Sequence, residues 1–347
     1  MAWLRRVLAH WALARSTTAL IEASGGAPRE VRGMTLDPRL QFIEARARER
    51  AIPWEEMTVE RLRAQTAVLA DMFGGSRVAG VRRQRIFMPG RSYSVPARLY
   101  LPKVRDNRAA MLVYFHFGAG VLGSLANCDR LCGLIAKFAG APVLSVEYRL
   151  APDYPFPTGL EDALHAYAWA IENAARYGAP VRRVAVGGDS IGANFASVIA
   201  QQQRSGRTPA ALQLLIYPGV DWVSDTPSMH DFADAFPLTA EALDFCMKRY
   251  IPEGADPANP RLSPGRTQDL KGLPPALVYT AGFDMLLDQG EAYADRMAEA
   301  GVKIVQRVRF DSLPHGFVSF PSAAPAAEAA LKRIARDTAA ALKSHNH

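Results

Sequence analysis

Residues 182–203 read RRVAVGGDSIGANFASVIAQQQ, and this stretch decides the fold. It begins as an apolar run of strand length and ends with the composition of a helix. Between these parts the segment GDSIG, residues 188–192, fits the pattern G-x-S-x-G. At a strand-to-helix junction this pattern makes a tight turn that holds the serine, Ser190, at the end of the strand. The alternative is an ordinary glycine-rich turn that binds phosphate, although the lysine of a P-loop is missing.

The order of strand and then helix repeats through most of the chain after residue 80. An initial antiparallel pair is predicted at 85–90 and 95–102. Apolar runs of buried-strand length follow at 109–117 and 141–150. Further strands are predicted at 182–190, 211–220, 274–284 and 302–310, and helices at 159–178, 191–203, 289–301 and 326–344. This alternation predicts an α/β fold, with a mostly parallel sheet that helices cover on both faces.

A nucleophilic serine needs a base, and the sequence offers few histidines for that role. In the chain order Ser, acid, His, the base is expected after Ser190. The histidines there are His230, His315, His345 and His347. His230 lies in a segment without strand signals, and the last two lie in a terminal tail. We predict His315 as the base, because it follows a strand on a loop and precedes the last helix.

The base in turn needs an orienting carboxylate. The segment AGFDMLLDQG, residues 281–290, contains two candidates. Asp284 ends the preceding strand, which places it at the same edge of the sheet as the serine. Asp288 lies at the start of a helix, where a carboxylate is favourable for capping alone. We therefore predict Asp284 as the acid and keep Asp288 as the structural alternative.

The segment YFHFGAGVLGS, residues 114–124, reads as a buried strand that ends in His116 and a glycine-rich loop. Such a loop lets backbone N–H groups face a ligand. Ester hydrolysis passes through a tetrahedral anion, and the loss of one donor to that anion costs on the order of a hundredfold in rate. A loop after the third strand and the residue after the nucleophile, here Ile191, are the usual sources of these donors.

Three segments together resemble the hormone-sensitive-lipase-like branch, bacterial family IV, of the α/β-hydrolase esterases. They are YFHFGAGVLGS, VEYRLAPDYPFPTGLEDA at 146–163, and GGDSIGANFA at 187–196. The second is the most specific, since members of the family typically carry Y-R-L-A-P-E-x-P-F-P-A there. This chain differs from that pattern by having Asp153 in place of the Glu. Two further segments, AGFDMLLDQG and LPHGF, agree with the family. The resemblance is strong over residues 80–347.

The resemblance implies an α/β-hydrolase fold with a helical cap, and it assigns roles by position. For catalysis it implies Ser190 as nucleophile, His315 as base and Asp284 as the orienting acid. For the oxyanion hole it implies the backbone N–H groups of Gly118, Ala119 and Ile191. His116 would be structural and would anchor the loop.

The loop departs from the family, which has H-G-G-G followed by an aromatic residue. Here Phe117 replaces the first glycine, Ala119 replaces the third, and Gly120 stands where the aromatic usually stands. Any non-proline residue supplies a backbone N–H, so the hole survives if Phe117 keeps a negative φ. We predict that Phe117 and Gly120 reshape the substrate pocket and restrict it to short to medium acyl chains.

Two stretches without the strand-helix alternation are expected to form the cap over the strand ends. The first is helical and rich in Arg and Glu, and the second shows helix signals near Thr239 but none for a strand. The predicted domains are 1–75 as the N-terminal part of the cap, 76–220 as the first part of the core, 221–262 as the cap insertion and 263–347 as the second part of the core.

The overall composition is that of a globular protein, with 49% hydrophobic and 22% charged residues. The net charge of +7 could indicate an anionic partner. Arginine is nevertheless spread along the chain, often beside an acid, and nucleic-acid binding requires a clustered basic patch. We therefore predict no nucleic-acid partner.

The chain has only three cysteines, which are Cys128, Cys132 and Cys246. A small, odd number of cysteines does not indicate a disulfide framework. Two thiols without a nearby histidine also make a poor zinc site. We interpret them as core residues of a protein in a reducing, cytoplasmic compartment, and we predict no metal and no cofactor.

Residues 1–20, MAWLRRVLAHWALARSTTAL, have the pattern of a basic amphipathic helix. Arginines interrupt the apolar run, so it is neither a transmembrane span nor a good signal peptide. The helix could lie on a membrane surface or cover a hydrophobic opening of its own protein. We favour the second, because packing is the usual fate of an apolar stripe. The stripe consists of Trp3, Leu4, Val7, Leu8 and Trp11.

The sequence thus predicts a serine carboxylesterase that hydrolyses short to medium acyl esters of small molecules. His315 would deprotonate Ser190, an acyl-enzyme would form, and water would attack it. The alternatives are an amidase or deacetylase with the same three residues, a non-catalytic binding protein that keeps the fold, and a lipase held on a membrane by residues 1–20. A homodimer is compatible with the sequence but is not indicated by it.

Overall fold

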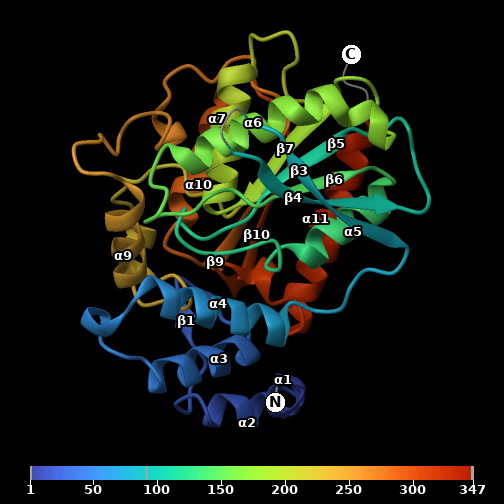
Figure 1. The fold of residues 1–347 in the computed structure, drawn as a ribbon. Helices are drawn as coiled ribbons and strands as arrows, with labels where there is room; N and C mark the ends of the chain where they lie inside the picture. The colour runs from blue at the N-terminus through green and yellow to red at the C-terminus, as the bar shows by residue number, and fades with distance from the viewer. Residues whose placement is uncertain (1, 91–92, 345–347) are drawn as a thin grey trace.

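The structure is a computed structural model, and it describes residues 2–90 and 93–344. Its centre is an eight-stranded sheet in the order β10-β9-β8-β7-β5-β6-β4-β3 (Figure 1). The strands are β3 (Val81–Met88), β4 (Val95–Pro102), β5 (Met111–Phe115), β6 (Val143–Val146), β7 (Val184–Asp189), β8 (Gln213–Ile216), β9 (Ala276–Phe283) and β10 (Ile304–Pro314). β4 pairs antiparallel with β3 and β6, and the other pairs are parallel. The predicted mostly parallel sheet is confirmed.

The central strands are apolar throughout because helices bury both of their faces. In β5 every residue is buried. Val113 and Phe115 belong to the core on one face of the sheet, and Leu112 and Tyr114 belong to the core on the other. This division follows from the alternation of side chains along a strand.

Helices cover the sheet on both faces. They are α5 (Asp129–Ala139), α6 (Thr158–Asn173), α7 (Ile191–Gln203), α10 (Leu287–Glu299) and α11 (Pro325–Lys343). Apolar residues of α6, α7 and α10 pack into one core, and those of α5 and α11 pack into the other. Helix α5 is an element that the sequence reasoning misses. Single 3-10 turns occur at η1 (Trp54–Glu56), η2 (Ala174–Tyr177), η3 (Pro264–Arg266) and η4 (Phe317–Ser319).

The N-terminal stretch is helical, as predicted, and forms a separate layer at one end of the molecule (Figure 1). Its helices are α1 (Ala2–Leu13), α2 (Thr17–Glu22), α3 (Pro38–Glu49) and α4 (Val59–Phe73). A short antiparallel pair, β1 (Glu30–Val31) and β2 (Met34–Thr35), was not expected there. Strands of two residues carry too little pattern to be found from sequence.

The insertion between β8 and β9 contains two helices, α8 (Pro227–Asp231) and α9 (Ala240–Tyr250). The predicted helix start is confirmed, because the Thr239 side chain caps α9 and accepts a hydrogen bond of 3.2 Å from the Ala242 N–H. Helix α9 lies near α4 in Figure 1, at the same end of the sheet. The two stretches that interrupt the alternation of the core are therefore neighbours in space.

The prediction that the apolar stripe of α1 packs against its own protein is wrong. Trp3 and Trp11 are each 74% exposed, and the rest of the stripe is exposed as well. The helix is held instead through its opposite face, where Leu13 is buried and the His10 ring meets the edge of Phe73 in α4 at 5.8 Å. None of the helices that the structure describes is long and apolar enough to cross a membrane.

Candidate active site

Ser190 occupies a sharp turn between β7 and α7. Its backbone has φ 59° and ψ −119°, and its N–H donates to the Ile216 carbonyl oxygen at 2.9 Å. The turn requires the two flanking glycines: a Cβ on Gly192 would overlap the carbonyl oxygen of Phe115 in β5, and one on Gly188 would overlap the backbone of Gly192. The strand end and the glycines therefore raise Ser190 into a fixed, strained position.

The three side chains predicted for catalysis meet at this turn. The Ser190 Oγ lies 3.0 Å from His315 Nε2, and His315 Nδ1 lies 2.8 Å from Asp284 Oδ2. All three residues are buried. The other oxygen of Asp284 accepts the Leu286 N–H at 2.8 Å, which fixes the carboxylate. A base that touches the hydroxyl and an acid that orients the base form the arrangement of an activated nucleophile.

The other candidates lie away from this arrangement. Asp288 accepts the Ser228 N–H at 2.8 Å and pairs with Arg32, so it ties α10 to α8 and to the β1–β2 turn. His230 is exposed and pairs with Asp225. His345 and His347 lie outside the described residues.

The carboxylate of Asp189, next to the serine, is a feature that the sequence reasoning misses. It is fully buried and accepts hydrogen bonds of 2.8 Å from the hydroxyls of Tyr114 and Tyr217. Burial raises the pKa of Asp189 to about 6. The Tyr217 ring packs 4.7 Å from the His315 ring. Asp189, Tyr114 and Tyr217 therefore pack against both the turn and the His315 imidazole. The sequence signal for this cluster is the acid at the second position of G-x-S-x-G.

The backbone N–H groups predicted for the oxyanion hole lie beside the serine. Gly118, Ala119 and Ile191 line the same cavity as Ser190 and His315. Within residues 2–90 and 93–344, none of these three N–H groups donates a hydrogen bond to the protein. Phe117 keeps a negative φ, which is the condition for the hole to survive, whereas Ala119 takes a φ of 51°. The altered loop thus offers free donors at the cost of strain at Ala119.

The two residues predicted to shape the pocket have different positions. Phe117 lines the cavity. Gly120 is not among the residues that line it, because the Tyr250 ring from α9 covers this position and would overlap any Cβ there. The aromatic ring that the loop lacks at position 120 is therefore supplied by the insertion.

The loop is anchored from both sides. His116 is buried, its Nδ1 lies 2.8 Å from the Phe117 carbonyl oxygen, and its ring stacks on Tyr148 at 4.4 Å. Burial lowers the pKa of His116 to about 4, so the ring is neutral and its Nδ1–H donates. Arg63 of α4 donates to the carbonyl oxygens of Val121 at 3.0 Å and Ala151 at 2.7 Å. His116 thus holds the start of the loop, and Arg63 ties its far side to α4.

The cavity above the serine has a volume of about 160 Å³. Both stretches outside the strand-helix alternation contribute to its walls. Helix α4 contributes Leu62, Gln65, Thr66 and Leu69, and the insertion contributes Trp222, Met229, Phe236, Pro237, Leu238, Ala242, Leu243 and Cys246. The walls are mostly apolar, so the site suits the uncharged part of a small molecule.

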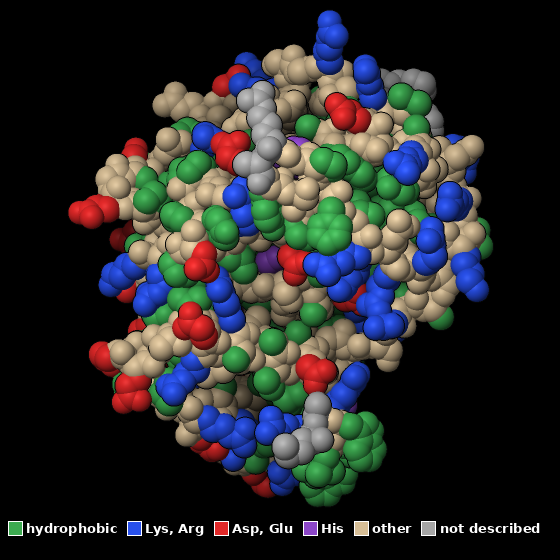
Figure 2. Space-filling view, in the orientation of Figure 1, with side chains coloured by type: hydrophobic (Ala, Val, Ile, Leu, Met, Phe, Trp, Pro, Cys, Tyr) green, Lys and Arg blue, Asp and Glu red, His purple; other side chains and the backbone are tan. Residues whose placement is uncertain are grey.

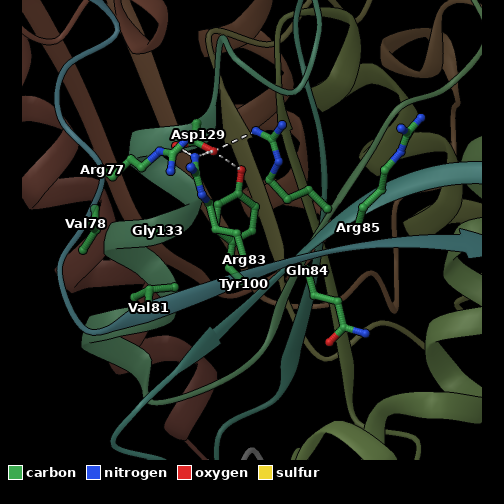
Figure 3. Close-up of a pocket in the computed structure, with 10 residues that line it drawn as sticks. Arg77, Val78, Val81, Arg83, Gln84, Arg85, Tyr100, Asp129 and Gly133 are labelled. Carbon is green, nitrogen blue, oxygen red and sulfur yellow. Dashed lines mark hydrogen bonds and ion pairs between the residues drawn. The ribbon is translucent and has the colours of Figure 1, made fainter.

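A second hollow lies against β3 and β4, and Figure 3 shows its lining. Asp129 accepts hydrogen bonds there from Arg83 at 2.6 Å, Arg98 at 2.8 Å and the Tyr100 hydroxyl at 2.9 Å. The described residues that line it include no serine, cysteine or histidine. These bonds tie α5 to the sheet, so the hollow does not compete with Ser190 as a reaction centre.

Metal chemistry has no candidate ligand set in the part of the chain that the structure describes. No group of three or more His, Cys, Asp or Glu side chains there could hold an ion. The cysteines Cys128, Cys132 and Cys246 are free and buried.

Comparison with known proteins gives one consistent result. Residues 112–319 match a family described by the alpha/beta hydrolase fold. The chain is 38% identical over 306 residues to the carboxylic ester hydrolase LipN of Mycobacterium tuberculosis, across 85% of this chain and 80% of that protein. It is 35% identical over 299 residues to the ethyl acetate hydrolase of Pseudomonas putida, across 83% and 94% of the two chains. The solved ester hydrolase EH1AB1 from the Lake Arreo metagenome matches with a TM-score of 0.81 and 32% identity, across 88% of this chain and 98% of that one.

Proposed function

The chain belongs to the hormone-sensitive-lipase-like esterases of the α/β-hydrolase fold and is a carboxylic ester hydrolase, and on this premise we propose that Ser190, His315 and Asp284 carry out the hydrolysis. The observation that carries the proposal is the continuous pair of contacts, 3.0 Å from Ser190 Oγ to His315 Nε2 and 2.8 Å from His315 Nδ1 to Asp284. The fold alone would not support it, since function depends on the site.

In the first half of the reaction, the Ser190 hydroxyl transfers its proton to His315 Nε2 while Oγ attacks the ester carbonyl carbon. Asp284 keeps the Nδ1–H oriented and stabilises the imidazolium that forms. His315 then gives the proton to the departing alcohol oxygen, and an acyl-enzyme remains. In the second half, water loses a proton to His315 and attacks the acyl carbon. His315 then returns this proton to Ser190 Oγ as the bond from Oγ to the acyl carbon breaks, which releases the acid and restores Ser190.

The negative oxygen of each tetrahedral intermediate is held by the N–H groups of Gly118, Ala119 and Ile191 in this proposal. Their freedom from other hydrogen bonds supports it, and so does the position of Ile191 at the start of α7, where N–H groups have no partner within the helix. Such donors are fixed in place before the charge develops, which is why they stabilise the transition state.

We propose that residues 1–75 and 221–262 form the cap, and that the substrates are small esters with short to medium acyl chains. Side chains from both cap segments line the cavity, which supports the first part. A cavity of about 160 Å³ is smaller than the pockets that enclose drug-sized ligands. Phe117 in its wall supports the same preference.

The experiment is hydrolysis of p-nitrophenyl esters from acetate to palmitate by the wild type and Ser190→Ala. We expect activity that falls with chain length and a loss of more than about 10³-fold in Ser190→Ala. Ser197→Ala is the matched control, because Ser197 is a buried serine of the same helix that donates to the Ala193 carbonyl oxygen. Activity retained by Ser190→Ala would refute the assigned nucleophile.

Two further measurements separate the remaining possibilities. A fluorophosphonate probe should label Ser190 covalently, whereas a pure binding protein would remain unlabelled. Faster cleavage of a p-nitroanilide than of the matching ester would instead identify an amidase.

Phe117→Gly should extend the acyl-chain profile of hydrolysis toward longer chains, and an unchanged profile would contradict the role given to Phe117.

A further inference from the structure

The outer face of α1 carries a contiguous group of exposed apolar side chains. Trp3 and Trp11 mark its ends, and Leu4, Val7 and Leu8 lie between them. Figure 2 shows hydrophobic side chains gathered at the lower end of the molecule, over the place of α1 in Figure 1, with Lys and Arg side chains nearby. Single exposed apolar residues are ordinary, but a contiguous patch marks an interaction surface. We propose that this face of α1 docks on an anionic membrane surface.

The way α1 is attached fixes the direction of the patch. Leu13 and the His10–Phe73 contact bind the opposite face of the helix to α4. The helix has 12 residues, so it is about 18 Å long and too short to span a bilayer. It is therefore suited to lie in the plane of the interface, with its apolar face among the lipid chains. Tryptophan is enriched at that depth, because its ring is apolar and its N–H is polar.

The charge around the patch selects the kind of lipid. Residues 1–21 contain three arginines and no acid. Arg5 and Arg6 lie on the helix beside the apolar stripe, and Arg15 follows its end. The ion pairs found within residues 2–90 and 93–344 leave all three without an acidic partner. Basic residues beside an apolar helix face are attracted to the phosphates of anionic lipids.

A groove beside α1 adds a place for a lipid headgroup. It has a volume of about 470 Å³, and its lining includes Arg6, Arg39 and Arg130. The acid in its lining, Glu328, is paired with Arg130. No ion pair among residues 2–90 and 93–344 involves Arg6 or Arg39, so both side chains can contact a phosphate at the edge of the patch.

The arginines beside the patch argue against a second copy of this chain as the occupant of this face of α1. In a symmetric dimer this face would meet its own copy, and residues 1–21 contain no acid that could pair with the arginines of the copy. A lipid surface complements the tryptophans and the arginines at once. The docking does not depend on the hydrolytic reaction, and it would place the enzyme at an anionic membrane surface.

The test is flotation of the full-length protein with vesicles of phosphatidylcholine, with or without phosphatidylglycerol. We expect the wild type to float with the anionic vesicles and to stay in solution with the neutral ones. Trp3→Ser with Trp11→Ser should lower the bound fraction about tenfold, because the helix loses its interfacial anchors. Arg5→Glu with Arg6→Glu should remove the preference for anionic vesicles, and added salt should weaken it in the wild type.

The matched control is Val104→Ser with Val181→Ser, which removes two side chains that are 82% and 76% exposed elsewhere on the surface. It should float like the wild type. Hydrolysis of p-nitrophenyl acetate in solution should be equal in all variants, which shows that they are folded. Wild type that does not float, or a tryptophan variant that floats equally, would overturn the proposal. So would a wild-type dimer that the tryptophan changes convert to monomer, because the patch would then be an interface between copies.

Discussion

Two glycine-bearing loops meet at Ser190, and they tolerate change very differently. The turn at 187–192 keeps every glycine of its pattern. The loop at 116–123 replaces two glycines with Phe117 and Ala119 and gains one at Gly120. Both loops supply N–H groups to the same cavity, so a shared function does not explain the difference.

The difference lies in what a Cβ would meet at each position. At Gly192 it would meet the carbonyl oxygen of Phe115, in the middle of the sheet, and at Gly118 it would meet the carbonyl oxygen of Leu122. Those glycines are kept. At Gly120 it would meet the ring of Tyr250, a side chain of α9. A backbone atom that a Cβ would overlap cannot be replaced by mutation. A side-chain ring can be supplied by a different segment of the chain. An exchange of glycine for a larger residue is therefore possible only where the neighbour is a side chain, as at Gly120.

The largest effect is expected from Gly192→Ala, which tests the backbone side of this comparison. The added methyl would push α7 away from β5 and displace the Ile191 N–H. We expect hydrolysis to fall about 100-fold and the free energy of unfolding to fall by about 3 kcal/mol. Gly290→Ala in α10 is the control, because the nearest atoms to a Cβ there belong to the side chains of Pro218 and Thr280, at 3.3–3.5 Å, and none belongs to the backbone. An active, stable Gly192→Ala variant would show that the turn is not fixed by this contact.

Gly120→Ala tests the side-chain side. The methyl would collide with Tyr250, and φ at Gly120 is 74°. We expect kcat/KM to fall about tenfold, because the loop shifts relative to Ser190. In a Tyr250→Leu background the same change should cost less, and a double-mutant cycle measures this coupling. Additive effects would mean that the ring and the glycine are not a matched pair.

Arg63→Ala tests whether α4 holds the loop in position. It leaves the carbonyl oxygens of Val121 and Ala151 without their charged donor. We expect the free energy of unfolding to fall by about 2 kcal/mol and kcat to fall about threefold, with KM unchanged, because the donors to the transition state lose their position. Arg63→Lys should recover part of kcat. A change confined to KM would assign Arg63 to substrate binding instead.

Ala119→Gly should have the smallest effect. It tests whether the positive φ of Ala119 strains the backbone of the loop. Glycine relieves the positive φ of 51°, and the relief is partly offset by the greater freedom of glycine in the unfolded chain. We expect the free energy of unfolding to rise by no more than about 1 kcal/mol and kcat to stay within about twofold. Chemical denaturation and steady-state kinetics measure both. A loss of stability would show that the Ala119 methyl packs favourably.

The core sheet could be predicted, and the residues proposed for catalysis could be selected, because their signals are local. Strands β5 and β9 are mostly apolar and buried throughout, and Asp284 follows the end of β9. His315 follows the end of β10, the partly exposed strand at the edge of the sheet. The face that α1 buries could not be predicted, because its anchor is the His10–Phe73 contact between distant segments. Periodicity identifies an apolar stripe but does not say what it meets.

The loop shows the same limit at the level of single residues. The negative φ at Phe117 was a condition that the sequence could state but not test. The position of Gly120 outside the cavity follows from Tyr250, which is 130 residues further along the chain and lies in α9. No local pattern connects the two. Asp189 likewise gains its role from Tyr114 and Tyr217, which belong to other parts of the chain.

The Tyr250 ring over Gly120 also limits how such enzymes can be recombined. A chimera that joins residues 221–262 to a core with an aromatic residue in its loop would place two rings in one space. The reverse chimera, this loop with an insertion that lacks the tyrosine, would leave a hole beside Gly120. The loop at 116–123 and the segment that carries Tyr250 would therefore have to be inherited together, although β6, β7 and β8 lie between them in the chain.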